Sequence, residues 1–174
     1  MQVPLVMTVI GRDKPGLVEA VATIVARHGG NWLESRMCRL GGEFAGILRI
    51  QIEAAQQEIL EQELTALGQH GLSIVIGSGR CGPEGRSGPM AALELVGQDR
   101  PGIVREISSA LARQGVNVEE LATECSSAPM TGEALFRAKA RLQLPKSCSL
   151  PELRKELERI AGNLLVDVVI DPLP

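Results

Sequence analysis

The sequence of 174 residues predicts an α+β protein built from two similar domains, each with an antiparallel sheet and helices on one face of it. Three observations support this prediction. A segment that begins at Gly11 recurs 86 positions later, and the same order of strand and helix patterns follows each copy. A stretch rich in glycine, proline and serine, residues 77–89, lies between the copies, as expected for an irregular linker.

The repeated segment reads GRDKPGLVEAVATIVARHGGNW from Gly11 and GQDRPGIVREISSALARQGVNV from Gly97, without a gap. Nine of these 22 positions are identical, and most of the others exchange similar residues. Similarity of this length inside one chain indicates a duplicated domain. We therefore expect a first domain at residues 1–79, a linker at 80–89 and a second domain at 90–174.

The first domain opens with an apolar, β-branched run at residues 3–10, which predicts a strand buried on both faces. A helix follows, because the apolar residues from Leu17 to Val25 recur at helical spacing. A residue before proline avoids the helical conformation, so this helix is expected to begin at about Pro15. Its expected end is the Gly29-Gly30 pair.

A hairpin and a second helix complete the first domain. Strands are expected at residues 32–40 and 44–52, joined by a tight turn at Gly41-Gly42. Residues 56–68 predict a helix, and residues 72–76 predict the last strand. One face of the strand at 44–52 carries Phe44, Leu48, Ile50 and Ile52, and the apolar residues of the second helix are Ile59, Leu60, Leu64 and Leu67.

The second domain repeats this order. Its strands are expected at residues 91–96, 117–125, 133–144 and 164–170, and its helices at 102–114 and 150–161. Pro145 ends the long strand, and Ser149 followed by Pro151 and Glu152 is typical of a helix start. The loop of the second hairpin, residues 126–132, is longer than the glycine turn of the first.

The order strand-helix-strand-strand-helix-strand is that of the ferredoxin-like, or split βαβ, arrangement. Right-handed crossovers place both helices on one face of a four-stranded antiparallel sheet. The other face of each sheet is then left to be covered or solvated. Exposed sheet edges also invite side-by-side pairing, so a symmetric homodimer is expected.

Composition excludes several classes of function. The net charge is -3 with no basic cluster in either half, which disfavours direct nucleic-acid binding. No apolar run approaches the roughly 20 residues that cross a bilayer, so no membrane association is expected. Four cysteines, Cys38, Cys81, Cys125 and Cys148, stand far apart with no C-x-x-C pair. Without a secretory signal, we expect reduced thiols in a cytoplasmic protein and no metal site.

Two glycine patterns resemble nucleotide-binding motifs and are rejected. GSGRCG at residues 77–82 fits G-x-G-x-x-G, but the prolines and glycines that follow it prevent a helix from starting. GRDKPG matches the first part of a phosphate loop, but Leu17 and Val18 replace the Lys-Ser/Thr that such a loop requires. No cofactor is therefore expected.

The turn GRDKPG is itself a candidate binding site. The first amides of the following helix lack partners within it and carry the positive end of the helix dipole, which suits a carboxylate. Gly16 lets a ligand approach these amides, and Asp13 can accept an ammonium group. Asn31 opens the next strand and offers both a donor and an acceptor. A carboxylate beside an ammonium describes an amino acid.

The alternative for this turn is structural. Asp-x-Pro-Gly is an ordinary helix start with aspartate as a capping or turn residue, and Gly-x-Asn is an ordinary helix end. Recurrence of both patterns at the same offsets favours the site, although shared fold constraints explain part of it. The candidate ligand-binding residues are Asp13, Pro15, Gly16, Leu17 and Asn31, with their counterparts Asp99, Pro101, Gly102, Ile103 and Asn117.

No catalytic residue is expected. An enzyme needs a nucleophile with a base, or paired carboxylates, and the helix-end histidines His28 and His70 fit capping or surface roles instead. Arg137, Lys139 and Arg141 share one strand face, which is expected to be solvated beside acidic neighbours such as Glu119 or Asp167, or to dock an acidic partner.

These motifs carry a resemblance. Two βαββαβ units, each with D-x-P-G opening the first helix and G-x-N before the second strand, resemble tandem ACT domains. Two such units in a chain of this length, with the second hairpin APMTGEALFRAKARLQLP, are similar to the glycine cleavage system transcriptional repressor family. The resemblance implies sensing of a small amino acid, such as glycine or serine, at the edge between two ACT domains. It also implies regulation through a protein partner.

The prediction from sequence is therefore a non-catalytic regulatory protein that binds a small amino acid and modulates a partner, possibly a transcription regulator of glycine cleavage. Two other readings stay open. One is a structural dimerisation module that binds no ligand, and the other is a detached regulatory subunit of a metabolic enzyme.

Overall fold

The computed structural model describes residues 1–77, 88–127 and 133–173. Its chain divides into two compact units, Met1–Gly82 and Pro83–Pro174, which we treat separately. The linker expected at 80–89 and the loop expected at 126–132 lie largely outside the described residues, as does most of GSGRCG.

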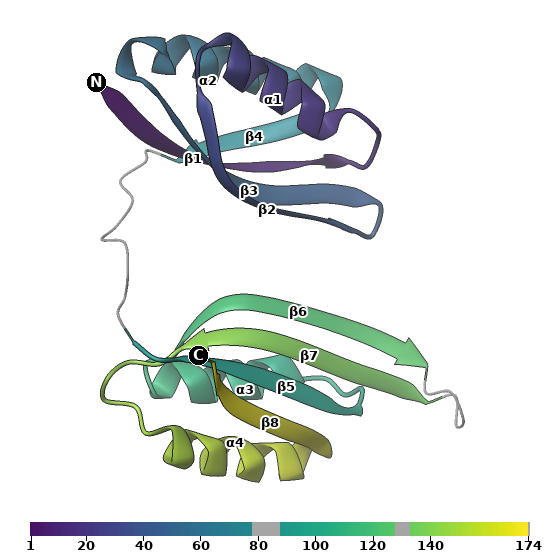
Figure 1. The fold of residues 1–174 in the computed structure, drawn as a ribbon. Coiled ribbons are helices and arrows are strands. Elements are labelled where there is room, and N and C mark those ends of the chain that lie inside the picture. The colour runs from purple at the N-terminus through teal and green to yellow at the C-terminus, as the bar shows by residue number, and fades with distance from the viewer. Residues whose placement is uncertain (78–87, 128–132, 174) are drawn as a thin grey trace. The chain divides into compact units, whose positions relative to one another are not determined.

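The first unit is a four-stranded antiparallel sheet with two helices on one face (Figure 1). Its strand order is β2-β3-β1-β4, so that β2 and β4 form the edges. A 3₁₀ turn precedes α2 and another follows it, at Ala54–Gln56 and Leu67–His70. The elements are β1 (Gln2–Arg12), α1 (Leu17–Arg27), β2 (Asn31–Leu40), β3 (Glu43–Glu53), α2 (Gln57–Ala66) and β4 (Leu72–Gly77).

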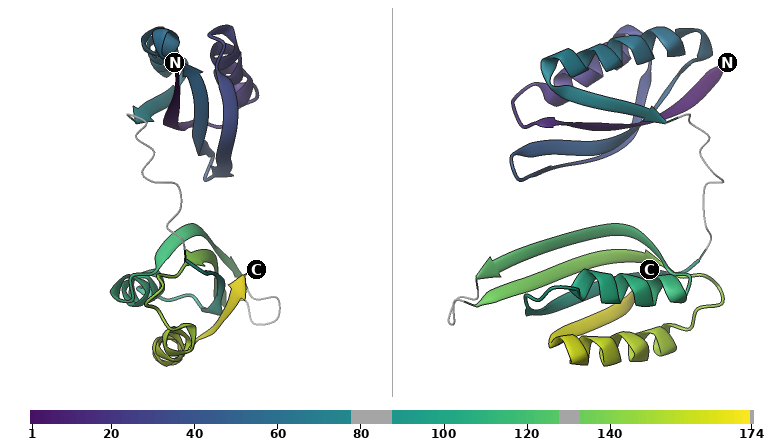
Figure 2. Two further views of the ribbon diagram at one scale, coloured as in Figure 1. Left: turned by 60° about the vertical axis from the view of Figure 1, so that its left-hand side comes forward. Right: turned by 180° about the vertical axis from the view of Figure 1, so that it is seen from behind.

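The second unit repeats this arrangement with the strand order β6-β7-β5-β8, and Figure 2 shows both of its helices on the same side of the sheet. Its elements are β5 (Met90–Gln98), α3 (Ile103–Arg113), β6 (Asn117–Ser127), β7 (Ala134–Gln143), α4 (Leu150–Leu164) and β8 (Val166–Leu173). The predicted fold class, two ferredoxin-like α+β domains, is confirmed.

Each core lies between the helices and one face of the sheet. In β3, Leu48, Ile50 and Ile52 are fully buried, as the alternation of the sequence predicts. The prediction that the first strand is buried on both faces is wrong for the unit by itself. In β1 only the residues on the helix side are buried, while Ile10 on the other side is 48% exposed, because both helices cover the same face.

Helix boundaries differ from the prediction at several points. α1 begins at Leu17 rather than Pro15, because Gly16 takes a left-handed conformation that no helix can include. α4 runs to Leu164, where a strand was expected, since Gly162 is accommodated inside the helix and the chain turns at Leu165 instead. In α2, Ile59 is 49% exposed and therefore lies outside the predicted apolar stripe.

Candidate functional site

The repeated turn has the same backbone geometry in both units. Gly16 and Gly102 precede the helices with φ of 92° and 98°, a left-handed conformation that favours glycine. The amide of Asp13 donates to the carbonyl oxygen of Gly42 at 2.9 Å, and that of Asp99 donates to Ala134 at 2.9 Å. Each turn is thus fixed against the hairpin of its own unit, with the first helical amides directed out of the helix end.

Leu17 and Ile103, the first helical residues, contribute no side chain to the turn. Their side chains are 6% and 2% exposed and belong to the cores. Only the backbone amides of these two candidate residues can serve a ligand. Pro15 and Pro101 precede the glycines and have no amide hydrogen to offer.

In the first unit, the carboxylate of Asp13 is paired with a cation. Nε of Arg39, on β2, lies 2.6 Å from Oδ2 of Asp13. Nζ of Lys14 donates to the carbonyl oxygen of His70 at 3.0 Å. An open hollow at this turn is lined by Asp13, Lys14, Gly16, Leu17, Val18, Glu19 and Phe44.

An acidic side chain also lies over this helix start. A Cβ built on Gly16 would be 3.9 Å from Oε2 of Glu19, so the carboxylate of Glu19 is near the positive end of α1. A cation, Arg39, and an anion, Glu19, of the same chain therefore lie beside the first turn. These neighbours speak against aspartate as a simple helix cap, since Asp13 interacts with Arg39 instead.

The second turn has different neighbours. Cys125 takes the place of Arg39 under the shift of 86 positions, and its thiol is hydrogen-bonded to Asp99. Loss of hydration raises the pKa of this thiol, and the charge of Asp99 and the hydrogen bond to it act in the same direction. Arg100 donates to Oε1 of Gln98 at 2.9 Å and therefore points back along its own strand end.

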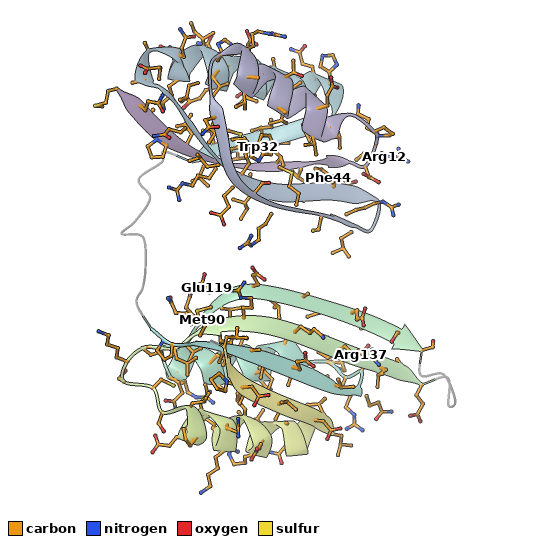
Figure 3. The ribbon with its side chains drawn as sticks, viewed as in Figure 1. Arg12, Trp32, Phe44, Met90, Glu119 and Arg137 are labelled. Atoms are coloured by element: carbon orange, nitrogen blue, oxygen red, sulfur yellow. The ribbon has the colours of Figure 1, made fainter. Side chains whose placement is uncertain are left out.

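The two asparagines do not lie beside the aspartates of their own units. Asn31 is paired with Gln51, and Gln51 with Pro4, at the start of β1, whereas Asp13 follows the end of that strand. The two ends are roughly 25 Å apart at the rise of a β-strand. Figure 3 labels Trp32, which follows Asn31, and Arg12, which precedes Asp13, at different positions along the sheet. Asn31 and Asp13 therefore do not meet within one domain.

Asn117 occupies the equivalent position in the second unit. Its side-chain amide donates to Oε1 of Glu119 at 2.7 Å. It lines an open hollow with Gly88, Gly115, Gln143, Leu144, Pro145 and Lys146, at the end of the sheet where β7 finishes. Asn117 and Asp99 are separated like their counterparts, because the element order and strand pairing are the same.

The three cations of β7 are each paired across the sheet. Lys139 lies 3.1 Å from Glu94, Arg141 lies 3.6 Å from Glu120, and Arg137 lies 3.9 Å from Glu124. The acidic neighbours expected from sequence were Glu119 and Asp167, but Glu119 lies near the other end of the sheet from Arg137 (Figure 3). The charges on this face compensate one another, which weakens the case for an acidic docking partner.

Of the capping and surface roles expected for His28, the structure shows the first, since His28 is the C-terminal cap residue of α1. It follows α1, and its side chain is 10% exposed, with Nε2 3.3 Å from Glu63 and Nδ1 3.4 Å from Gln56. The described cysteines, Cys38, Cys125 and Cys148, are free thiols. In the described parts of the chain, no group of three or more acidic, histidine or cysteine side chains forms a potential metal site, and no helix has the length and apolar character to cross a membrane.

Sequence reasoning missed Arg39, Glu19 and Cys125 as neighbours of the turns. The ungapped shift that aligns the repeated segments also aligns Arg39 with Cys125 and Glu19 with Arg105, but it does not show that these residues lie beside the turns. The pairing of Arg39 with Asp13 depends on the return of β2 past the turn, which the sequence does not display directly.

Comparison with known proteins agrees with this architecture. Family models of the ACT domain match residues 3–76 and 91–139. Over 81 residues the chain is 33% identical to the UPF0237 protein MK1213 of Methanopyrus kandleri, which spans 46% of this chain and 83% of that protein.

Two solved structures match over nearly the whole length. A crystal structure of an unknown protein from Galdieria sulphuraria is 28% identical, with a TM-score of 0.89 and full coverage of both chains. A candidate glycine cleavage system transcriptional repressor is 20% identical, with a TM-score of 0.74 over 99% of this chain and 98% of that one; at this identity the match shows the fold alone. The chain belongs to the ACT-domain family and contains two ACT domains in tandem.

Proposed function

We propose that this protein is a non-catalytic, cytoplasmic regulator that senses a small amino acid, such as glycine or serine, and modulates a partner protein. The observation that carries the proposal is the repeated turn, in which helix amides without partners lie beside an aspartate. Tandem ACT domains suit this role, since ACT domains are typical of amino-acid-sensing regulation and generally associate with one another.

The partner is proposed to be a regulator of transcription acting on glycine cleavage. Support comes from the fold shared with the candidate glycine cleavage system transcriptional repressor. The charge pattern of the second sheet, where each cation of β7 has an acidic neighbour, offers no extended positive surface for DNA. We therefore propose an effect on transcription through protein contact.

A homodimer would complete the proposed site. β2 is an edge strand, and antiparallel pairing of two β2 edges about a two-fold axis places the start of one strand beside the end of the other. Asn31 of the partner subunit would then approach the Asp13 turn, which Asn31 of the same domain does not reach. Pairing in this way would explain why both residue types recur in both repeats.

A thermal-shift assay with glycine and L-serine at millimolar concentration tests the sensor. Binding to the folded state raises the free energy of unfolding by about 2.7 kcal/mol at a ligand concentration 100 times Kd, and the melting temperature rises with it. The Asp13→Ala/Asp99→Ala double variant should keep its fold and lose the shift. Asp171→Ala, an exposed aspartate at the opposite end of β8 from the second turn, is the matched control. An unchanged shift in the double variant would remove the turns as the site.

A second candidate function is dimerisation without a ligand. A hollow between α3 and the edge strand β6 is lined only by apolar surface, and Val104, Val118 and Leu121 at its rim are 44%, 39% and 54% exposed. Such a surface beside an unpaired edge favours association. If no amino acid raises the melting temperature while Leu121→Asp converts a dimer to monomers in sedimentation velocity, this candidate replaces the sensor.

A further inference from the structure

The sheet of the first unit exposes an apolar surface on the face opposite its helices. This surface, which we call the first open face, consists of Val6, Thr8 and Ile10 of β1 and their cross-strand partners on β2, β3 and β4. Ile10, Ile47 and Val75 on it are 48%, 56% and 65% exposed. They lie on three adjacent strands, and Thr8 is paired with both Ile47 and Val75. The exposed apolar side chains therefore form one patch and are not scattered single residues.

The equivalent surface of the second sheet, the second open face, is charged. Glu94 and Lys139 form an ion pair of 3.1 Å at the positions that Thr8 and Ile47 occupy in the first unit. Three of the twelve residues in the cross-strand rows of the first open face are charged: Glu34, Arg36 and Arg49. On the second open face eight of twelve are charged, namely the six members of the ion pairs on β7 together with Asp167 and Asp171. The second open face is thus suited to water, whereas the first exposes apolar area to it.

The composition of the first open face decides what can cover it. Its charged residues lie near the β2 edge, where Arg36 is 3.7 Å from Glu34, so a strongly charged partner would meet few opposite charges. The second open face would lose the hydration of its ion pairs, and an apolar surface returns no hydrogen bonds for that loss. Among the described sheet faces, the one with matching apolar character is the first open face itself, presented by a second copy of the chain.

The size of this face is sufficient for an interface between two copies. Strands lie about 4.8 Å apart and rise about 3.4 Å per residue, so the four strands over the span from Pro4 to Arg12 present roughly 500 Å². Two such faces would bury about 1,000 Å² together, which is the lower limit for a specific interface. Short side chains on the face, at Ala45 and Ser73, suit the spacing of about 10 Å between packed sheets.

We propose that the first open face is an interface between two copies of this chain, which pack sheet against sheet about a two-fold axis. This contact uses the face of the sheet and not its edge, so it is separate from the pairing of β2 edges and does not depend on amino-acid binding at the turns. Together with the β2 pairing it would assemble four chains. The charged second open face would limit this association to the first unit.

Transfer of one ion pair between the two sheets tests this interface. The variant Thr8→Glu/Ile47→Lys places at the centre of the first open face the pair that Glu94 and Lys139 form at the same register position. It keeps the net charge and should fold, because the second unit accommodates this pair. In sedimentation velocity at tens of micromolar protein, the wild type should be a dimer, or a tetramer if the β2 edges also pair. The variant should have half the mass of the wild type, since the interface would bury its charges.

The control changes the same two positions of the other sheet. Glu94→Lys/Lys139→Glu exchanges the charges of the pair on the second open face and should keep the mass of the wild type. A monomeric wild type would overturn the inference and leave the first open face to a partner of another kind. An unchanged mass in folded Thr8→Glu/Ile47→Lys would also overturn it. Neither outcome decides whether an amino acid binds at the turns, which the thermal-shift assay measures.

A labelling measurement distinguishes this face from the β2 edge. Val75 lies on β4, the edge strand opposite β2. In Val75→Cys, iodoacetamide should alkylate the new thiol several-fold more slowly in concentrated than in dilute protein, and peptide mass spectrometry reports it separately from the native thiols. Val169→Cys, at the equivalent position of the second open face with Val169 55% exposed, should react equally fast in both. Equal rates for Val75→Cys in concentrated and dilute protein would overturn the inference, even for a protein that dimerises.

Discussion

Gly97 on β5 lies directly against the backbone of Val166 on β8, so that a Cβ added to Gly97 would be 2.6 Å from Cα of Val166. The same Cβ would lie 2.7 Å from the carbonyl oxygen of Leu165. Gly11 meets Gly71 and Leu72 in the same way in the first unit. The glycine that opens both copies of the repeated turn is thus required by the close approach of two strands and not by a ligand.

Gly97→Ala should destabilise the protein by about 1–3 kcal/mol, because backbone atoms must move to admit the methyl group. The measurement is urea unfolding followed by circular dichroism. Gly162→Ala is the matched control: no atom lies within 4 Å of its Cβ position, and the residue is inside α4. Alanine there should stabilise by about 0.5–1 kcal/mol. Equal effects at the two positions would contradict the close contact.

Two adjacent apolar residues of α2, Leu60 and Ile59, differ in burial. Leu60 is fully buried and Ile59 is 49% exposed, although both are apolar neighbours. Leu60→Ala should cost about 2–5 kcal/mol of unfolding free energy through lost contacts and a cavity. Ile59→Ala should change it much less, within about 0.5 kcal/mol for a surface position. Chemical denaturation of both variants measures the difference, and similar losses would place Ile59 in a core.

Glu156 on α4 should make the second unit sensitive to acid. Its carboxylate accepts hydrogen bonds from Arg113 at 2.9 Å and Gln114 at 3.0 Å, and these hold its pKa below the ordinary value of 4.5. A pKa that is lower in the folded state contributes stability above pH 4.5, which is lost as pH falls through the folded value.

Melting temperatures between pH 7 and pH 3 check this expectation. Glu156→Gln should melt below the wild type at pH 7, and the two should converge at the acid end as the wild-type carboxylate is protonated. Glu158→Gln on the same helix is the control and should follow the wild type. A constant difference between Glu156→Gln and the wild type across the whole range would show that the carboxylate charge is not the cause.

The thiol of Cys125 should respond to Asp99. Because the Asp99 carboxylate contributes to the raised pKa of this thiol, Asp99→Asn should lower that pKa and speed alkylation by iodoacetamide near pH 8. Mass spectrometry of the Cys125 peptide over a pH series gives the profile. Asp13→Asn changes the equivalent residue of the other unit and should leave the profile unmoved. An unchanged alkylation profile in Asp99→Asn would show that the Asp99 carboxylate does not affect the Cys125 thiol in solution.

The architecture could be predicted almost entirely from sequence, because the duplicated pattern and the two hydrophobic periods fix the element types and their order. The errors concern helix boundaries, where the conformation of a single residue decides whether the helix continues. Gly16 moved the helix start from Pro15 to Leu17 through its left-handed conformation, and α4 continued beyond its expected end at residue 161 to Leu164. Such boundaries depend on packing of the whole turn and not on local propensity.

The candidate site was predicted in part. The sequence located both turns, and their open helix ends follow from the Pro-Gly pattern. It did not show that Asn31 and Asp13 lie at opposite ends of the sheet. That separation follows from the pairing of β2, β3 and β1, which the order of the motifs does not display. It also gave no reason to join Arg39 to Asp13.

The sequence alone determined that this chain is two copies of one βαββαβ domain, since hydrophobic periodicity and repetition are properties of residue order. Only the tertiary structure decided which charges surround each copy of the turn. Ion pairing depends on atoms brought together from distant strands, and two exchanges, Arg39 for Cys125 and Glu19 for Arg105, give two turns of the same backbone geometry different electrostatic surroundings.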